Sequence, residues 1–224
     1  MKRISILQPN YMPWRGYYKI IKNSDCVVLY DDVQYTKNDW RNRNIIKSAK
    51  GPIWLTIPVR VKNLNQRINE TYSVNNNWYE KHYKSIRQNY SKSRYYNKYI
   101  DNFQEFYQNK KPRKITAIIE NFNNIIFEIL EISTKIIYSS DLGVTGNRNE
   151  RLIRILKKLG ADTYLSGPSA SSYIDQELFK VNKIDIEWVS YQMPMYKQVF
   201  DGFIPNLSIV DLIFNTGTEA NYYF

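Results

Sequence analysis

The sequence predicts an α/β protein whose core is a parallel or mixed β-sheet with flanking helices. Short apolar runs alternate along the chain with stretches whose apolar residues recur at helical spacing. The first two runs enclose a turn and a short helical pattern, as in a β-α-β unit. A block with helical spacing only lies around residues 77–133. We therefore predict one Rossmann-like α/β domain over residues 1–224, with a helical subdomain at roughly 77–133.

The opening of the chain gives the clearest elements. Arg3–Leu7 is a predicted buried strand, Trp14–Lys22 a short helix, and Cys26–Tyr30 a second buried strand. Ile53–Val59 ("IWLTIPV") is a third strand, closed by Pro58. This strand–turn–helix–strand opening distantly resembles that of the nucleotidyltransferase superfamily. Tyr17, however, stands where those enzymes carry a phosphate-binding histidine.

The rest of the chain continues the alternation after the helical block. Gly160 follows the pattern "ILKKL" and is typical of a helix C-cap. In the helical block we predict helices at Trp78–Tyr90, Tyr96–Tyr107 and Ile115–Ser133, with a charged break at Lys110–Lys114. Beyond it we predict strands at Lys135–Tyr138, Thr163–Ser166 and Asp185–Ser190, and helices at 149–159, near Asp175–Val181 and near Ser208–Phe214.

Composition limits the class of protein. The chain has 224 residues, of which 43% are apolar, and no apolar stretch approaches the roughly 20 residues of a membrane span. Because a strand begins at once, we expect no signal peptide. The single cysteine, Cys26, excludes an intrachain disulfide and a cysteine-based metal cluster, and indicates a reducing cytoplasm.

The net charge is +11, from 32 basic and 21 acidic residues. Such an excess favours anionic partners: nucleotides, RNA, acyl carrier protein or a membrane surface. A general bias of the sequence towards Asn, Lys, Ile and Tyr explains the same excess without any partner. Both readings remain open at this point.

Polar residues follow three of the predicted strands. Gln8, Asp31 and Ser166 each lie at or just past a strand end, and ligands of α/β sheets bind at the carboxyl edge of the strands. We expect these side chains to converge there. Pro9 and Pro13 fix φ in the first turn, which lowers the entropy lost when a ligand binds.

The stretch "QPNYMPWRGYY" is the first candidate binding segment. Gln8 and Asn10 carry amides that hydrogen-bond a ligand, and Tyr11 and Trp14 carry rings that stack on a base or a sugar. The alternative is a strand-to-helix turn whose amides satisfy the backbone and whose tryptophan is in the core.

The stretch "YDDVQYTKNDWRNRNIIK" is the most concentrated polar segment. Asp31 and Asp32 adjoin at a strand end, which suits a general base, or a Mg²⁺ site beside a phosphate. Arg41 and Arg43, with Asn42 between them, suit a phosphate clamp. The alternative is a solvated loop with internal Asp–Arg pairs.

Three further segments carry candidate residues. His82 is the only histidine and lies on a predicted helix; no zinc-ligand spacing accompanies it. The hydroxyl-rich turn after Ser166 suits an anion, though it is neither a Walker loop nor a nucleophile elbow. Ser208 and Asp211 read as a helix cap, with Asn206 before them. Interleaved aromatic and basic residues at 78–107 suit either an RNA surface or a helical core.

Together, six motifs resemble the WbqC-like protein family and run from residue 4 to about 217. They are "QPNYMPWRGYY", "YDDVQYTKNDWRNRN", "WLTIPV", "WYEKHYKSIRQNY", "LGADTYLSGPSASSYID" and "GFIPNLSIVDLIFNTG". One departure is Leu7, where many members carry histidine and others an apolar residue. Carried over residue by residue, the resemblance points to Gln8, Pro9, Asn10, Asp31, Asp32, Gln34, Trp40, Asn42, Arg43, His82, Ser166, Gly167, Pro168, Ser169, Asn206, Ser208 and Asp211.

The resemblance implies a cytoplasmic enzyme that decorates a nucleotide-linked sugar for bacterial O-antigen, as in lipopolysaccharide, or another surface polysaccharide. We expect a transferase that acylates or aminoacylates the amino group of a nucleotide-linked deoxyamino sugar. Its base is Asp31, Asp32 or His82, and its donor is acyl-CoA, acyl carrier protein or aminoacyl-tRNA. The alternatives are an ATP- and Mg²⁺-dependent ligase or nucleotidyltransferase-like enzyme, and an RNA- or carrier-binding module without catalysis.

Overall fold

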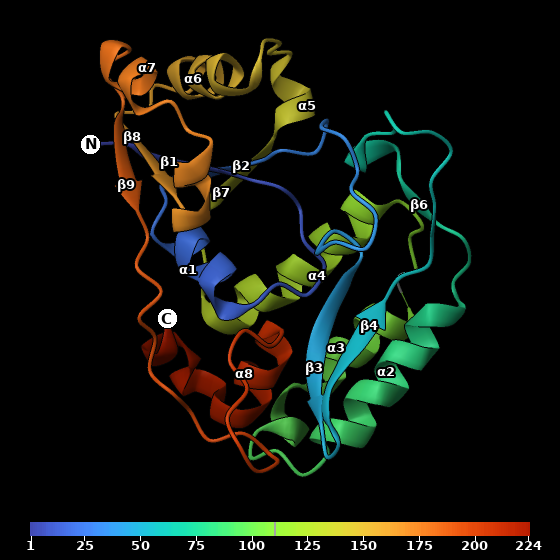
Figure 1. The fold of residues 1–224 in the computed structure, drawn as a ribbon. Coiled ribbons are helices and arrows are strands. Elements are labelled where there is room, and N and C mark those ends of the chain that lie inside the picture. The colour runs from blue at the N-terminus through green and yellow to red at the C-terminus, as the bar shows by residue number, and fades with distance from the viewer. Residues whose placement is uncertain (110) are drawn as a thin grey trace. The chain divides into compact units, whose positions relative to one another are not determined.

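The computed structural model describes residues 1–109 and 111–224 and divides them into two compact units (Figure 1). Each unit is assembled from three separate segments of the chain. Unit 1 consists of residues 1–8, 17–32 and 133–192. Unit 2 consists of residues 9–16, 33–132 and 193–224.

Unit 1 is built on a five-stranded parallel sheet, which confirms the predicted α/β class. Its strands in chain order are β1 (Arg3–Leu7), β2 (Cys26–Leu29), β7 (Lys135–Tyr138), β8 (Thr163–Ser166) and β9 (Asp185–Trp188). The order across the sheet is β7-β2-β1-β8-β9, and every neighbouring pair is parallel. The strand β2 is buried along its whole length, and such a strand reads as a continuous apolar run, which is why the sequence located it.

Helices lie on both faces of this sheet. On one face, α6 (Arg148–Lys158) and α7 (Gln176–Val181) pack on apolar residues of β1 and β2. On the other, Ile20 of α1 (Arg15–Lys22) packs with Leu165 and Val189. The short helix α5 (Ser139–Leu142) follows β7, and the 3₁₀ turn η2 (Pro168–Ser172) follows β8. Gly160 adopts φ +65° just beyond α6, as the cap prediction requires.

Unit 2 combines a β-hairpin with a layer of helices. The hairpin pairs β3 (Arg43–Ser48) with β4 (Gly51–Thr56) in antiparallel register. The predicted strand Ile53–Val59 therefore ends at Thr56 and has a partner that the sequence reading missed. Arg43, Asn44 and Lys47 interrupt the apolar pattern of β3, so it read as a polar loop. The short β5 (Val59–Arg60) and β6 (Tyr72–Ser73) also pair, on either side of η1 (Ile68–Glu70).

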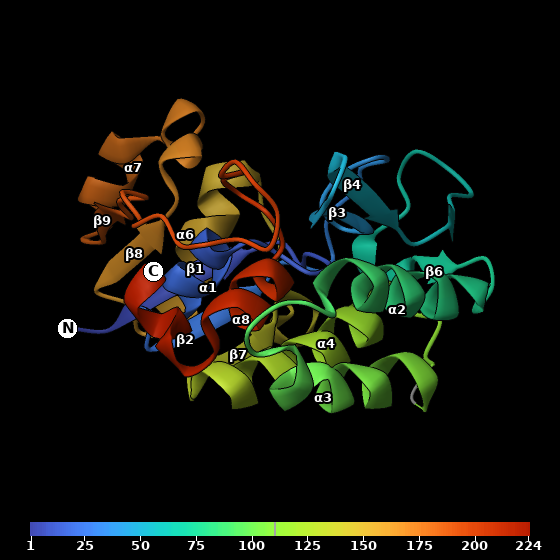
Figure 2. The same ribbon diagram turned by 90° about the horizontal axis from the view of Figure 1, so that it is seen from below.

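The predicted central helices are present almost at the expected bounds. They are α2 (Asn77–Tyr90), α3 (Tyr96–Gln108) and α4 (Ile115–Leu130), and Figure 2 shows them lying side by side in unit 2. The chain ends with α8 (Ile209–Thr216) and the 3₁₀ segment η3 (Gly217–Tyr223). Phe103, Phe122 and Phe214 form part of an aromatic core between these helices. The predicted charged break at Lys110–Lys114 includes residue 110, which lies outside the described residues.

Among the helices described, none is long and apolar enough to cross a membrane.

Candidate functional site

Four residues singled out in the sequence line one pocket of unit 2. The pocket has a volume of about 180 Å³. Asn10, Trp14, Trp40 and Asn206 line it, together with Pro13 and Asn44. We call it the amide–aromatic pocket, because three carboxamides and two indoles surround it and no ionisable side chain is among its lining residues.

Backbone hydrogen bonds hold the segments of this pocket in place. The N–H of Tyr11 donates to the carbonyl of Trp40 at 2.9 Å, and the N–H of Ile209 donates to the carbonyl of Pro13 at 2.9 Å. Between the two prolines, Met12 adopts the left-handed φ of +49°. Its rigid neighbours restrict the conformations that the free turn can adopt. The proline-bearing turn thus fixes Asn10 and Trp14 before any ligand arrives.

The carboxamides that line the pocket differ in how many hydrogen bonds they already make within the protein. Asn44 donates from Nδ2 to the carbonyl of Tyr11 at 3.1 Å and accepts the N–H of Ile45 at 2.8 Å, so it mainly positions the backbone. The Oδ1 of Asn10 accepts from Arg41, whose guanidinium also pairs with Asp39 at 2.9 Å. A cationic group therefore lies directly beside the pocket-lining amide of Asn10.

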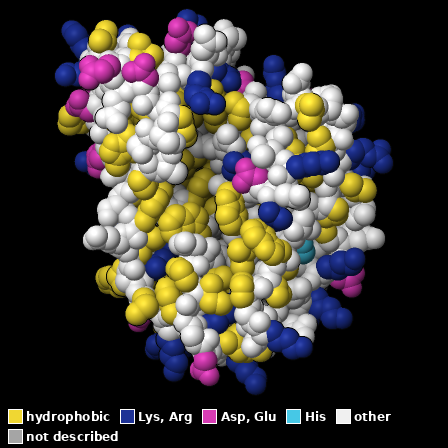
Figure 3. All heavy atoms as spheres, in the orientation of Figure 1, with side chains coloured by type: hydrophobic (Ala, Val, Ile, Leu, Met, Phe, Trp, Pro, Cys, Tyr) yellow, Lys and Arg dark blue, Asp and Glu magenta, His cyan; other side chains and the backbone are white. Residues whose placement is uncertain are grey.

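A second indole extends the aromatic surface beyond the pocket. The rings of Trp40 and Trp54 have centroids 5.5 Å apart at an interplanar angle of 32°. The guanidinium carbon of Arg43 lies 4.3 Å from the ring centroid of Trp54. We call Trp40, Trp54 and Arg43 the indole platform. Figure 3 shows hydrophobic side chains gathered over β3 and β4, with Lys and Arg side chains beside them.

Sequence reasoning missed Trp54, although a signal was present. In "IWLTIPV" the residues alternate, and Trp54 falls on the exposed face while Leu55 is buried. A tryptophan on the solvent side of a strand is unusual enough to have been noted.

His82 lies in unit 2 but lines a different pocket. That pocket, of about 380 Å³, is lined by His82 with Thr56, Pro58, Asn75, Asn77, Trp78 and Lys81. Only a small part of the ring reaches the surface, seen as the single cyan patch in Figure 3. Its Nδ1 is 2.9 Å from the hydroxyl of Tyr11. Burial lowers the pKa of His82 to about 4, against a smaller opposing effect of a hydrogen bond with the Thr56 backbone. The ring is therefore neutral at pH 7.

Tyr11 belongs to the core rather than to a surface. It is fully buried, and its ring contacts those of Trp78, His82 and Phe122. Its hydroxyl also lies 2.8 Å from the hydroxyl of Tyr107. Burial, followed by the neighbouring Tyr107, raises its pKa well above the ordinary value. With its ring faces taken by protein neighbours, Tyr11 has no face left for a ligand.

Asp31 and Asp32 lie in unit 1, where they hold the start of α5. Asp31 is buried and accepts hydrogen bonds from the N–H of Ser140 at 3.1 Å, its hydroxyl at 2.9 Å and the hydroxyl of Ser139 at 3.1 Å. Asp32 pairs with Arg151 and shares the single hydroxyl hydrogen of Ser139 with Asp31. Burial by itself would raise the pKa of Asp32, but the bonds from Ser139 and Arg151 outweigh it and leave this pKa below its ordinary value.

Gln8 and the turn after Ser166 lie at the switch point of the unit 1 sheet. The chain leaves β1 towards β2 on one side and β8 towards β9 on the other, and such a point is a common nucleotide site. The Oε1 of Gln8 is buried and has no hydrogen-bond partner among the residues that the structure describes. Ser166 is buried and Ser169 is exposed. A Cβ at Gly167 would lie 2.7 Å from the hydroxyl of Tyr191, so only glycine fits there without a shift.

The remaining candidates have local partners. Gln34 donates to the carbonyl of Leu64 at 2.5 Å, and the buried Asn42 donates to the carbonyl of Ile57 at 2.8 Å. Ser208 caps α8 by accepting from the N–H of Val210 at 3.4 Å. These contacts stabilise the fold around the pocket and place none of the three side chains in its lining.

Asp211 takes part in a buried polar network. It is fully buried on α8 and accepts from the hydroxyl of Tyr196 at 2.7 Å. Burial raises its pKa to about 6, although Tyr196, Tyr90 and the charge of Lys47 oppose the shift. The Nζ of Lys47, also buried, donates to Gln198 at 3.1 Å and to the carbonyls of Phe200 and Gly202. The sequence reading missed Lys47, since nothing in its neighbourhood marks a buried lysine.

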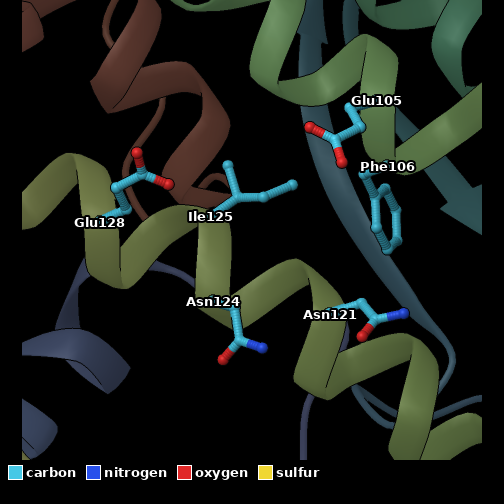
Figure 4. A pocket seen from close by; sticks show the side chains of 6 residues that line it. All are labelled: Glu105, Phe106, Asn121, Asn124, Ile125 and Glu128. Atoms are coloured by element: carbon cyan, nitrogen blue, oxygen red, sulfur yellow. The ribbon is translucent and has the colours of Figure 1, made fainter. Parts of the chain in front are cut away.

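A third pocket, of about 260 Å³, lies on α3 and α4. Figure 4 shows Glu105 and Phe106 from α3 with Asn121, Asn124, Ile125 and Glu128 from α4. None of these residues was singled out in the sequence. Within the described residues, no group of three or more His, Cys, Asp or Glu side chains is arranged to hold a metal ion.

Comparison with known proteins identifies relatives of this chain. A family model described as the WbqC-like protein family matches residues 8–223. The uncharacterized protein Rv1507c of Mycobacterium tuberculosis is 39% identical over 225 aligned positions, which cover 100% of this chain and 97% of that protein. No solved structure matches the chain. The family match spans nearly the whole length and includes the pocket and the sheet edge, so the protein belongs to the WbqC-like family.

Proposed function

We propose that the protein is a transferase that acylates or aminoacylates the amino group of a nucleotide-linked deoxyamino sugar, in the synthesis of a bacterial surface polysaccharide. The observation that carries the proposal is the amide–aromatic pocket. The carboxamides of Asn10 and Asn206 and its two indoles suit a sugar, whose hydroxyls need hydrogen bonds and whose C–H faces stack on aromatic rings, while Asn44 mainly positions the backbone. Family membership covers the same residues.

The charges beside the pocket suit the nucleotide part of such a substrate. Arg41 contacts Asn10, and Arg43 lies over Trp54 close by. A guanidinium binds a diphosphate through its fork of N–H donors. The net charge of +11 also suits the donors considered, because acyl-CoA, acyl carrier protein and aminoacyl-tRNA are all anionic.

The proposed transfer forms a bond between the amine nitrogen and the acyl carbon. The bond from that carbon to the donor's sulfur or oxygen breaks, and the amine loses a proton to a base. No lining residue of the amide–aromatic pocket is ionisable, so we assign the pocket to binding. Proton removal is assigned to one of Asp31, Asp32 and His82, of which only His82 lies in the same unit.

The first test is binding of nucleotide sugars. Purified protein is titrated with dTDP-, UDP-, GDP- and CDP-linked amino sugars by calorimetry, and the tightest binder is then assayed for acyl transfer with each donor. Asn206→Gly removes a pocket amide and keeps the left-handed backbone, since Asn206 has φ +62°. Asn38→Gly is the matched control, because Asn38 is exposed, has φ +54° and does not line the pocket.

We expect Asn206→Gly to weaken binding of the nucleotide sugar about tenfold, which is the effect of losing one hydrogen bond between the protein and its ligand. Asn38→Gly should bind like the wild type. If none of the nucleotide sugars binds, or if both variants bind as the wild type does, the pocket is not the substrate site and the proposal fails.

One observation favours a second candidate, an ATP-dependent ligase or nucleotidyltransferase-like enzyme. At the switch point of the parallel sheet in unit 1, β1 is followed by Gln8, whose buried Oε1 has no hydrogen-bond partner among the described residues, and the neighbouring β8 is followed by the turn at Gly167. Nucleotides commonly bind at such a point. Release of pyrophosphate or phosphate from ATP, measured with and without the nucleotide sugar, separates the two: simple acyl transfer consumes no ATP.

A further inference from the structure

Two large indole rings remain exposed on unit 2. Trp40 exposes 42% and Trp54 47% of its surface, whereas Trp78 exposes only 3%. Exposed tryptophans are uncommon, and two of them in contact form an apolar surface that water solvates poorly. The guanidinium of Arg43 lies 4.3 Å from the ring of Trp54, which adds a cation to this surface.

Backbone hydrogen bonds fix the positions of the two residues that carry these rings, and the contacts of the rings with each other and with Arg43 limit their side-chain freedom. Trp54 lies on β4 directly opposite Ile45 in the antiparallel register, and its strand neighbours alternate between buried and exposed. The Trp40 carbonyl accepts from Tyr11 at 2.9 Å, and its N–H donates to Asp39 at 2.7 Å. A surface ordered in this way loses little entropy when a flat ring stacks on it.

The indole platform is continuous with the amide–aromatic pocket, because Trp40 belongs to both. An occupant that spans the two has a hydroxyl-rich part in the pocket and a flat, delocalised ring on the indoles. Arg43 over Trp54 supplies a positive charge that matches a negative group of the occupant, whereas Arg41 beside Asn10 is already paired with Asp39. A nucleobase joined to a sugar through a diphosphate has this sequence of groups.

We propose that the indole platform binds the nucleobase of the substrate, stacked on Trp54 and Trp40, while the sugar lies in the amide–aromatic pocket. The assignment of the sugar rests on the proposed function. The stacking of the base does not, and it is testable with nucleotides that carry no sugar. In this arrangement Trp54, which the sequence did not single out, replaces Tyr11 and Trp14 as the ring that contacts the base.

The test measures binding of UDP, dTDP, CDP, GDP and ADP to the full chain by tryptophan fluorescence and calorimetry. Trp54→Leu should weaken binding of the tightest of these nucleotides by about fivefold to a hundredfold or more, because stacking on one aromatic side chain contributes roughly 1–3 kcal/mol per base. Trp54→Phe keeps an aromatic face and should restore most of the affinity. The control Tyr72→Leu removes a ring of similar exposure, 49%, outside the platform and should change nothing.

The outcomes separate this inference from the proposed function. If Trp54→Leu binds nucleotides as the wild type does, or if no nucleotide binds, the platform is not a base site. If nucleotides bind through Trp54 but no nucleotide sugar is acylated, the inference stands and the proposed transferase fails. If oligouridylate binds more tightly than UDP and through Trp54, the platform belongs to single-stranded RNA and the assignment to the substrate's base is overturned.

Discussion

At the scale of single residues, Asp211 couples the stability of unit 2 to pH. Burial raises its pKa to about 6, whereas an unfolded aspartate has a pKa near 3.9. The folded state thus holds the proton more tightly. The resulting stabilisation is fully present below about pH 4 and is lost as pH rises through 6. Two pKa units correspond to about 3 kcal/mol.

We predict that Asp211→Asn loses this contribution to the pH dependence of the unfolding free energy between pH 4 and 6, because asparagine does not titrate while it still accepts the hydroxyl of Tyr196. Urea denaturation at pH 4, 5, 6 and 7 measures the effect. The control is Asp101→Asn, which removes an exposed carboxylate on α3. An Asp211→Asn protein with the wild-type dependence on pH would mean that this carboxyl titrates normally.

His82 changes the unfolding free energy in the opposite direction over the same range of pH. Burial lowers its pKa to about 4, from about 6.5 in the unfolded chain, so the unfolded state binds the proton first. Its stabilisation is fully present above about pH 6.5 and is lost as pH falls through 4. The magnitude is again about 3 kcal/mol, so the two groups nearly cancel around pH 5.

Because the contributions of Asp211 and His82 to the unfolding free energy nearly cancel in the wild type, we predict that His82→Gln reveals the contribution of Asp211. Without the histidine, only the Asp211 effect remains, and the unfolding free energy should fall as pH rises from 4 to 6. In Asp211→Asn it should rise over the same interval, and the double variant should be nearly flat. The same urea titrations measure all three. If the unfolding free energy changed with pH in the same direction in both single variants, this account would be wrong.

At the scale of elements, two adjacent aspartates fasten the start of α5 to the end of β2. Asp31 accepts hydrogen bonds from the N–H and the hydroxyl of Ser140, shares the hydroxyl hydrogen of Ser139 with Asp32, and is 3% exposed. We predict that Asp31→Asn lowers the unfolding free energy by about 1–3 kcal/mol, since the amide presents N–H groups where the carboxylate accepted hydrogen bonds. Thermal and urea denaturation measure this loss.

The same variant separates a structural from a catalytic role. If Asp31 only fastens the helix, Asp31→Asn lowers stability while its turnover, once a substrate is known, stays within a few-fold of wild type at a temperature where the variant is folded. A loss of about a hundredfold or more with unchanged stability would instead assign it the part of the base.

The helices and strands also show which parts of the fold and of the site can be predicted from a sequence and which cannot. The parallel strand β2 was predictable because it is a continuous apolar run, and α2 to α4 because their aromatic and aliphatic residues recur at helical spacing. The strand β3 was not, because Arg43, Asn44 and Lys47 find their partners only in the folded protein. Asn10, Trp14, Trp40 and Asn206 were named as candidates, but the sequence gives no distances and so did not show that they share one pocket.

Burial caused the other differences between the expected and observed site. Tyr11, Asn42, His82 and Asp211 are polar residues in motif-rich segments, and each finds its hydrogen bonds inside the protein. A polar side chain reads the same in a sequence whether its partner is a ligand or a neighbouring residue. Only the fold distinguishes the two.

At the scale of the whole molecule, neither unit is a continuous piece of chain. The backbone passes between the units after residues 8, 16, 32, 132 and 192. The passage after residue 16 lies inside the helix α1, which runs from Arg15 to Lys22. The aromatic core of unit 2 also needs the last segment, since Phe214 of α8 lies 5.1 Å from Phe103 of α3 between ring centroids.

This connectivity predicts that the two units unfold in one cooperative step. If unit 1 alone unfolded, residues 17–32 and 133–192 would become two flexible loops whose ends unit 2 must still hold together, which costs entropy.

The tryptophans allow a direct test, because Trp188 lies in unit 1 and the other four lie in unit 2. In Trp188→Phe, fluorescence reports on unit 2 only, while far-ultraviolet circular dichroism reports on the whole chain. The two urea transitions should coincide in midpoint and slope. A circular dichroism transition that begins at lower urea than the fluorescence transition would show that unit 1 unfolds separately. The part of α1 that follows residue 16 would then unfold with unit 1.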